Sequence, residues 1–176
     1  MARQTGFKIP GLTEWVDRVK NVTAQETTEL IVYVLQVEGP AYTGEFRNAW
    51  VALPTPNGRV PAAQKSKYTT PLDRMTTPTE PREDIEVKPL KGNLPRAGYT
   101  IGNKMEYRDI ALDLDPNKVR TTPPKEGNTA DPDWYLKFAQ GQGPNTLTWC
   151  LQAGANRATK NPIVRGFNPG SRGTRF

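Results

Sequence analysis

The sequence predicts an α+β protein with a modest core, and three features of the chain lead to this prediction. Apolar residues at helical spacing occupy the N-terminal part, short strand-like segments follow it, and long proline-rich stretches separate the regular elements. The 176 residues include 15 Gly and 17 Pro, about 18% together where roughly 12% is usual, and only 35% are hydrophobic. A single domain is expected at this length. The composition indicates that this domain carries long, proline-stiffened extensions.

Residues 13–37 are predicted to form one long helix. Thr13 follows a Pro-Gly pair and precedes an acidic residue, which is typical of a helix start. Apolar residues then recur every three or four positions: Leu12, Trp15, Val16, Val19 and Val22. The β-branched content of residues 30–37 (LIVYVLQV) would also suit a strand. We favour a continuous helix because neither Gly nor Pro interrupts the segment before Gly39.

The elements after this helix are shorter. Phe46 and Trp50 fit one face of a helix and also one side of a strand, so we interpret residues 42–53 as one helical turn that runs into a strand. Segments 84–88 and 98–103 are predicted to be further strands. Three short helices are expected at 106–114, 133–139 and 145–158, and the last of them places Leu147, Cys150, Leu151 and Ala155 on one face.

The predicted organisation has three parts and one long loop. An N-terminal arm covers residues 1–12, a single α+β domain covers 13–158, and a basic tail that is expected to be unfolded covers 159–176. The loop at 54–83 lies within the domain and contains six prolines. Because structureless loops of this length are unusual inside a compact domain, we expect this one to become ordered chiefly against another subunit or protein.

Positive charge is concentrated at the C-terminal end of the chain. The net charge is +6, and the segment 134–176 contains no Asp or Glu. Its basic residues are Lys137, Arg157, Lys160, Arg165, Arg172 and Arg175. They account for the whole excess, since the rest of the chain is neutral. This asymmetry predicts an acidic partner, either nucleic acid or the acidic face of another protein.

The sequence also disfavours several other classes of protein. No apolar run approaches the roughly 20 residues that span a bilayer, so we expect no membrane partner. The N-terminal residues lack the apolar stretch of a signal peptide. The single cysteine, Cys150, permits no internal disulfide and is interpreted as a small core residue. These features favour folding in a reducing cytoplasm, or in a particle assembled there.

The residue types present do not favour an enzyme. The chain has no histidine, the commonest general base and the commonest metal ligand. Asp113, Asp115 and Asn117 imitate the opening of a calcium loop, but the Gly and the Glu that such a loop requires later are both missing. We interpret these carboxylates as a solvated helix end. We expect no catalytic residue, no metal and no cofactor.

Two short motifs, one on each side of the long loop, connect the chain to a known family. The first is GPAYTGEFRNAW (residues 39–50), in which a Pro-x-x-Thr-Gly turn ends the long helix and a basic-aromatic segment follows. The second is YTIGNKMEY (residues 99–107), an I-x-N-x-x-x-Y pattern that opens a short helix. In order, spacing and flanking helix they resemble the tail-completion, or neck, proteins of tailed bacteriophages. The resemblance covers residues 13–53 and 98–115. The chain departs from the family pattern at Glu45, where a basic residue is frequent, and at Asn48, where Ser is usual.

The resemblance implies a long N-terminal helix packed on a small antiparallel sheet. It also implies a structural virion protein that assembles in the host cytoplasm into a ring at the neck or tail end, around the path of the DNA. The expected partners are further copies of the chain (a hexamer is favoured over a dodecamer), the head–tail adaptor or portal-side and tail proteins, and DNA in the lumen, bound non-specifically. Candidate interface residues are Thr43, Gly44, Arg47, Trp50, Asn103 and Tyr107.

Individual roles can be predicted for the first motif. Gly44 would allow a tight reversal of the chain. Phe46 and Trp50 would lock the turn onto the long helix, although both could equally be ordinary core residues. Arg47 would project sideways toward a carboxylate of a neighbouring subunit.

A second hypothesis treats the protein as a nucleic-acid-binding module that acts through its basic C-terminal region. The residues that would contact DNA, or an acidic protein, are Arg157, Lys160, Arg165, Arg172 and Arg175. Only Phe167 and Phe176 offer aromatic rings for base stacking after residue 158, so phosphate contacts would have to supply most of the affinity.

Overall fold

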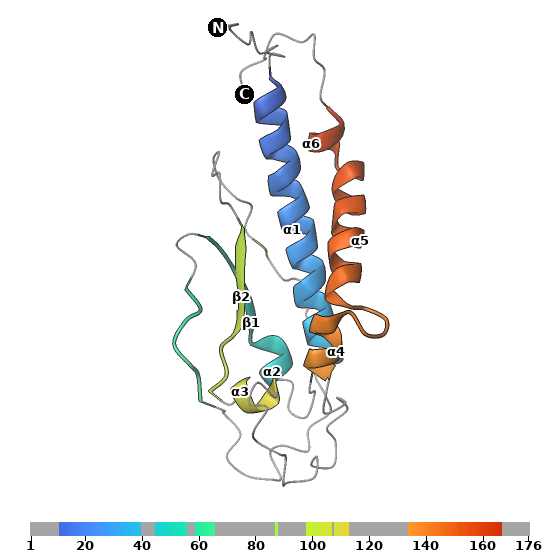
Figure 1. Cartoon of the computed structure of the whole chain (residues 1–176). Helices are drawn as coiled ribbons and strands as arrows, with labels where there is room; N and C mark the ends of the chain where they lie inside the picture. The colour runs from blue at the N-terminus through green and yellow to red at the C-terminus, as the bar shows by residue number, and fades with distance from the viewer. Residues whose placement is uncertain are drawn as a thin grey trace, which may run out of the picture.

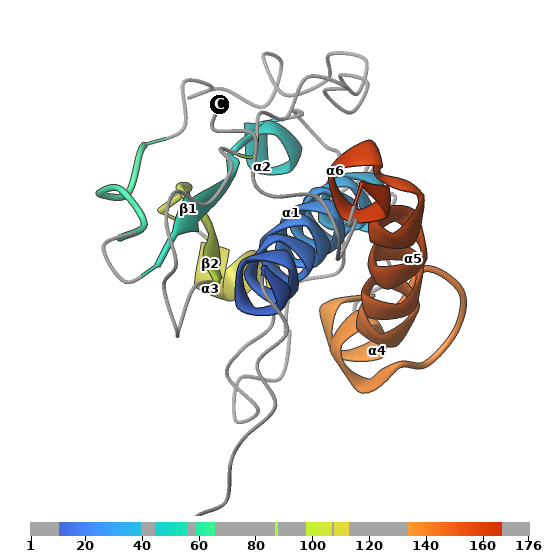
Figure 2. The same cartoon turned by 90° about the horizontal axis from the view of Figure 1, so that it is seen from above.

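The computed structural model describes residues 11–39, 45–55, 59–65, 87, 98–106, 108–112 and 134–166. These residues form an α+β fold in which a long N-terminal helix packs on a small two-stranded antiparallel sheet, as predicted. The helix lies between the sheet on one side and a second helical layer on the other, and Figure 2 shows this order from above. In the part of the chain that is described, no helix is both long enough and apolar enough for a membrane crossing.

Helix α1 (Leu12–Glu38) is the predicted long helix, and its 27 residues correspond to about 40 Å of helix. Its two halves are buried differently. In the N-terminal half the apolar residues are only partly buried, whereas Leu30, Val32, Val34 and Leu35 are almost completely buried. The C-terminal half runs between the sheet and the other helices (Figure 1), so its apolar residues are covered from two sides. This double burial explains why residues 30–37 combine strand-like composition with helical structure.

The predicted helical turn and strand after α1 are both present. Helix α2 (Glu45–Asn48) leads into strand β1 (Trp50–Pro54), which pairs antiparallel with β2 (Tyr99–Asn103) from Trp50↔Asn103 to Pro54↔Tyr99. Backbone hydrogen bonds extend the ladder beyond both ends of the strands. The Lys104 N–H donates to the Ala49 carbonyl (3.0 Å), and the Thr55 N–H donates to the Gly98 carbonyl (2.9 Å).

Residues 59–65 run beside β2 and belong to the same subunit. The Gln64 N–H donates to the Lys104 carbonyl (2.7 Å), and the Glu106 N–H donates back to the Gln64 carbonyl (3.1 Å). A Cβ added at Gly102 would lie 2.3 Å from a Val60 methyl group, so Val60 packs directly on the strand. Residues 59–65 of the predicted loop 54–83 therefore contact their own subunit, through the backbone of Lys104 and Glu106 just after β2 and through Gly102 within it.

The remaining described elements are helical. They are α3 (Arg108–Ala111), α4 (Trp134–Gln140), α5 (Leu147–Lys160) and α6 (Pro162–Arg165). The first three correspond to the predicted helices at 106–114, 133–139 and 145–158. The predicted strand at 84–88 lies outside the described residues except for Val87, which is buried. The acidic residues at 113–117 also lie outside them.

Helix α5 packs along α1 through small residues. Cys150, Gly154 and Ala158 are buried at four-residue spacing, and Leu147 is partly buried. The predicted apolar face was wrong at Leu151, whose side chain is 54% exposed. The α5 residue at the contact with α1 is instead Gly154, whose lack of a side chain lets the α5 backbone approach the backbone of Thr27.

The prediction that residues 159–176 form an unfolded tail, with a domain boundary at 158, is wrong for residues 159–166. Helix α5 continues to Lys160, and the side chain of Asn161 accepts a hydrogen bond from the Ile163 N–H (3.0 Å) at the start of α6. The indole of Trp15 on α1 donates to the Val164 carbonyl (3.0 Å). This contact joins residues that are 149 positions apart in the sequence, and it holds α6 against α1.

Candidate functional site: the α1–α2–β1 junction and a basic pole

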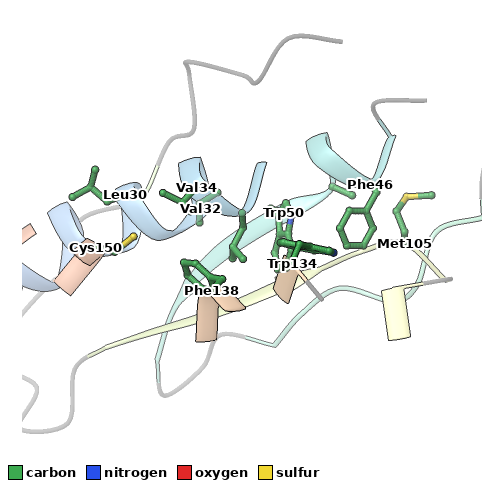
Figure 3. Packing of buried hydrophobic residues seen from close by; sticks show 11 residues of the cluster. Leu30, Val32, Val34, Phe46, Trp50, Met105, Trp134, Phe138 and Cys150 are labelled. Atoms are coloured by element: carbon green, nitrogen blue, oxygen red, sulfur yellow. The ribbon is translucent and has the colours of Figure 1, made fainter. Parts of the chain in front are cut away.

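An aromatic cluster joins the end of α1 to the sheet. Phe46 and Trp50 are almost completely buried and meet edge to face with their ring centroids 5.7 Å apart. Trp134 from α4 meets Phe46 in the same way at 6.3 Å, and its indole donates to the Ala111 carbonyl (3.1 Å). Figure 3 shows these three rings pointing toward one another beside Met105. Edge-to-face pairs of this kind stabilise a fold beyond the area they bury, so the expected locking role of Phe46 and Trp50 is met inside the subunit.

Gly39 permits the tight end of α1. A Cβ at this position would lie 2.6 Å from the Leu35 carbonyl oxygen and 3.5 Å from the Trp134 ring. The contact with the ring would be an ordinary one, but the clash with the carbonyl means that any larger residue would distort the last turn of α1. The glycine that opens the first motif thus has a steric function in the fold.

Asn103 connects the two motifs. Its amide Nδ2 donates to the Phe46 carbonyl (2.8 Å), and its Oδ1 accepts from the Met105 N–H (2.9 Å). The guanidinium of Arg108 donates to the Asn103 carbonyl (3.2 Å). Because Asn103 is only 2% exposed, its side chain is bonded within the subunit and is not available to a neighbour. The prediction of Asn103 as a subunit-contact residue is replaced by a role in holding α2 against the end of β2.

Arg47 also points inward. Its Nη2 donates to the Val37 carbonyl (3.2 Å) in the last turn of α1, and the residue is half-buried. Helix α1 has no basic residue of its own in that turn, so Arg47 supplies the positive charge that a helix C-terminus favours. Arg47 thus has a contact within its own subunit, and its contact with a neighbouring subunit stays a prediction.

The described candidate residues of the two motifs, Arg47, Trp50 and Asn103, all lie at this junction. The other three candidates, Thr43, Gly44 and Tyr107, lie outside the described residues. Sequence reasoning missed Trp134, which completes the aromatic cluster from more than 80 positions away, and its only signal was an unassigned aromatic at the start of a predicted helix.

The second candidate region lies at the opposite end of α1. Arg157 and Lys160 in the last turn of α5 and Arg165 in α6 are all exposed, and we call these three residues the basic pole. The Arg165 Nε donates to the Thr159 carbonyl (3.2 Å), which joins α6 to the end of α5. The candidates Arg172 and Arg175 lie outside the described residues. No acidic residue occurs anywhere in 134–166, but Glu26 of α1 accepts a hydrogen bond from the Asn161 Nδ2 (3.4 Å) between α5 and α6, so one carboxylate lies beside the pole.

No group of three or more His, Cys, Asp or Glu side chains that could hold a metal ion lies together among the described residues. Cys150 is fully buried, and its burial raises the pKa of the thiol to about 11, so the thiol is protonated at neutral pH. No protein-family model, no curated protein and no solved structure matches this chain.

Proposed function

We propose that the protein is a structural subunit of the neck or tail end of a bacteriophage virion, where copies of the chain close into a ring around the DNA path. The proposal starts from the two motifs and is supported by one observation. The motifs are separated by about 50 residues, yet Asn103 of the second bonds directly to Phe46 of the first. The two motifs therefore belong to one structural unit, which is expected if both come from the same protein family.

The surface supplies a second argument. Large apolar side chains are roughly half exposed on four of the described helices: Tyr33, Leu136, Trp149, Leu151 and Ile163. A neighbouring subunit that covered them would bury apolar area at roughly 25 cal/mol per Å². In the proposed ring some of these side chains form the contacts between copies, and the long loop contacts the adjoining adaptor or tail proteins. In this proposal the protein has no catalytic role.

The direct test is the native mass of the purified protein, together with negative-stain images. A closed ring, six-fold in preference to twelve-fold, is the expected result. A protein that remains monomeric at high concentration, and is also monomeric within an intact particle, would contradict the proposal.

A pair of variants locates the contact. Leu151→Asp places a charge at an exposed apolar position of α5, whereas Gln152→Asp places the same charge at the neighbouring exposed polar position. If α5 lies at the ring contact, Leu151→Asp should dissociate the ring while Gln152→Asp preserves it. Circular dichroism of both variants checks that α5 remains folded.

A further inference from the structure

One face of the C-terminal half of α1 is left open by the rest of the described subunit. Tyr33 is 50% exposed, although Val32 and Val34 on either side of it are almost completely buried. Glu29 and Glu26 precede Tyr33 by four and seven residues, so the three side chains lie within about 60° of one another around the helix. Both glutamates are partly exposed. We call Glu26, Glu29 and Tyr33 the acidic stripe of α1.

Helix α5 carries a stripe of the opposite charge. Trp149 is 44% exposed, and the exposed Arg157 and Lys160 follow it by eight and eleven residues. The three side chains therefore lie within about 80° of one another around α5. This face points away from the small residues that pack on α1 of the same subunit, since Trp149 is about 140° from Gly154 around the helix. We call Trp149, Arg157 and Lys160 the basic stripe of α5.

Neither stripe is neutralised within the described subunit. The Glu29 carboxylate accepts from the Gln25 amide (3.1 Å), and the Glu26 carboxylate accepts from the Asn161 amide (3.4 Å), so both partners are uncharged. Among the described residues, no cation forms an ion pair with either glutamate, and no carboxylate forms one with the basic stripe. The two helices lie side by side (Figure 1), yet their opposite charges do not pair with each other.

Helix electrostatics explain only part of the basic stripe. Cations in the last turn of a helix stabilise its carbonyl end, which gives Arg157 and Lys160 a local role in α5. That role does not explain the exposed indole of Trp149 on the same face. It also leaves unexplained why α1 presents an exposed aromatic ring beside two carboxylates that have no cation.

We propose that the basic stripe of α5 in one copy of the chain packs antiparallel on the acidic stripe of α1 in a second copy. Trp149 then lies against Tyr33, and the two cations lie beside the two glutamates. The inference deepens the proposed function, because it rests on the assembly of copies and assigns the two surfaces that meet.

The spacing of the two stripes fixes the direction of the contact. Tyr33 and Glu26 are about 10.5 Å apart along α1, and Trp149 and Arg157 are about 12 Å apart along α5. The aromatic residue is nearer the C-terminus in the acidic stripe and nearer the N-terminus in the basic stripe. Only antiparallel helices therefore place ring against ring and charge against charge. In a parallel arrangement Arg157 would lie beyond Glu38, where α1 ends.

A second copy is the partner that this chemistry favours. The acidic stripe supplies two carboxylates and an aromatic ring, which match the two cations and the indole of the basic stripe in number and in order. An aromatic pair beside an arginine is typical of protein interfaces, where Tyr, Trp and Arg contribute most of the binding energy. Leu151 lies about 160° from Trp149 around α5, so its substitution tests a different face of the helix.

Charge reversal tests the contact, measured as the native mass of the full chain by sedimentation velocity over a range of concentrations. Glu26→Lys/Glu29→Lys makes both stripes basic, and Arg157→Glu/Lys160→Glu makes both stripes acidic. Each variant alone should raise the dissociation constant between copies by at least about tenfold, because like charges then face each other. An equimolar mixture of the two variants should associate as the wild type does, because each stripe again meets its opposite.

Two further variants control for charge and for folding. Arg59→Glu/Lys65→Glu makes the same change of charge in the exposed segment beside β2 and should keep the wild-type mass. Trp149→Ala leaves every charge in place and should also weaken association by about tenfold, as the loss of a central aromatic residue does. Circular dichroism checks that each variant is folded.

Several results would overturn the inference. They are normal association of either charge-reversed variant, a mixture of folded variants that does not associate, and an equal loss in the control. If Arg157→Glu/Lys160→Glu keeps the wild-type mass but no longer binds a labelled DNA duplex, the basic stripe faces nucleic acid instead. A wild-type ring that survives both reversals refutes only the contact. A wild-type dimer that responds to reversal and mixing as expected refutes only the ring, and a wild type that stays monomeric refutes both.

Discussion

Helix α1 is held on its two sides by two different kinds of contact. At its C-terminal end large rings fill the space toward the sheet, where Phe46 meets Trp50 of β1 and Trp134 of α4 edge to face. Toward α5 the contact consists of small residues, and at Gly154 the two backbones approach so closely that an added Cβ would lie 2.6 Å from the Thr27 Cα. The difference predicts opposite sensitivities. The aromatic contact should be destabilised when one of its residues becomes smaller, whereas the contact between α1 and α5 should be destabilised when one of its residues becomes larger.

The largest effect is expected from Trp50→Ala. Truncation of a buried aromatic side chain costs about 3–5 kcal/mol, a large part of a typical stability of roughly 5–15 kcal/mol. The matched control is Trp149→Ala, because Trp149 is 44% exposed on α5. Thermal unfolding should show a large loss for the first variant and a small one for the second. Equal losses would mean that the aromatic cluster does not hold α1 on the sheet.

Asn103→Ala should be the next most damaging change on the sheet side. It leaves the buried Met105 N–H without a side-chain partner and removes one hydrogen bond from the Phe46 carbonyl, which still accepts from the Ala49 N–H (3.2 Å). The unsatisfied N–H costs about 1–3 kcal/mol and the lost bond about 0.5–1.5 kcal/mol, so a loss of about 2–4 kcal/mol in unfolding free energy is expected. Asn156→Ala, at an exposed asparagine of α5, should cost far less by the same denaturant titration. A neutral Asn103→Ala would show that the bond between the two motifs is dispensable.

Gly154→Ala tests the packing of α5 on α1. We expect this change to destabilise the protein, although helix propensity alone would favour alanine. In an open helix, alanine stabilises relative to glycine by about 0.8–1 kcal/mol. Here the new methyl group would lie 2.2 Å from Thr27 Oγ1 and 2.8 Å from the Thr27 N, so we expect a net loss of about 1–3 kcal/mol. Adding Thr27→Ala should rescue little, because the backbone contacts remain. A full rescue in the double variant would show that only the threonine hydroxyl limits the approach.

Cys150, in the contact between α1 and α5, should make the stability of the protein depend on pH. Burial raises the pKa of the folded thiol to about 11, whereas an unfolded thiol titrates near 8.5. Between these values the unfolded chain binds fewer protons than the folded one, so stability should fall as pH rises from about 9 to 11. The loss attributable to this group is at most about 1.4 kcal/mol per pH unit. The difference between the unfolding free energies of the wild type and Cys150→Ala, measured across this pH range, isolates the contribution of the thiol. If the two pH profiles are parallel, burial does not raise the pKa of the thiol.

The smallest effect is expected from Arg47→Ala. It removes a charge-assisted hydrogen bond to the Val37 carbonyl at the end of α1, which corresponds to about 0.5–1.5 kcal/mol in a half-buried setting. Arg18→Ala, at an exposed position of the same helix, should change stability by less than about 0.5 kcal/mol. If Arg47→Ala leaves the melting temperature unchanged and weakens only assembly, then Arg47 faces a neighbouring subunit after all.

Local patterns in the sequence determined most of the secondary structure of the described chain. Apolar spacing predicted α1 to within a residue at each end, and the spacing of Phe46 and Trp50 predicted a helical turn followed by a strand within residues 42–53. These features follow from propensity and periodicity within a few residues, so the sequence alone can reveal them. The concentration of positive charge after residue 133 is likewise a property of the sequence.

Tertiary structure decided which way the side chains point and where the fold ends. Asn103 and Arg47 turn inward because their hydrogen-bond acceptors, on Phe46 and Val37, are brought beside them by packing. Helix α6 forms in a segment that looks unstructured, where Asn161 caps its start and Trp15 from the other end of the chain bonds to Val164. A glycine in a helix interior ordinarily lowers helix stability, yet Gly154 allows the α5 backbone to approach Thr27 of α1 closely. In each case the deciding partner lies far away in the sequence, and short-range patterns carry no information about such a contact.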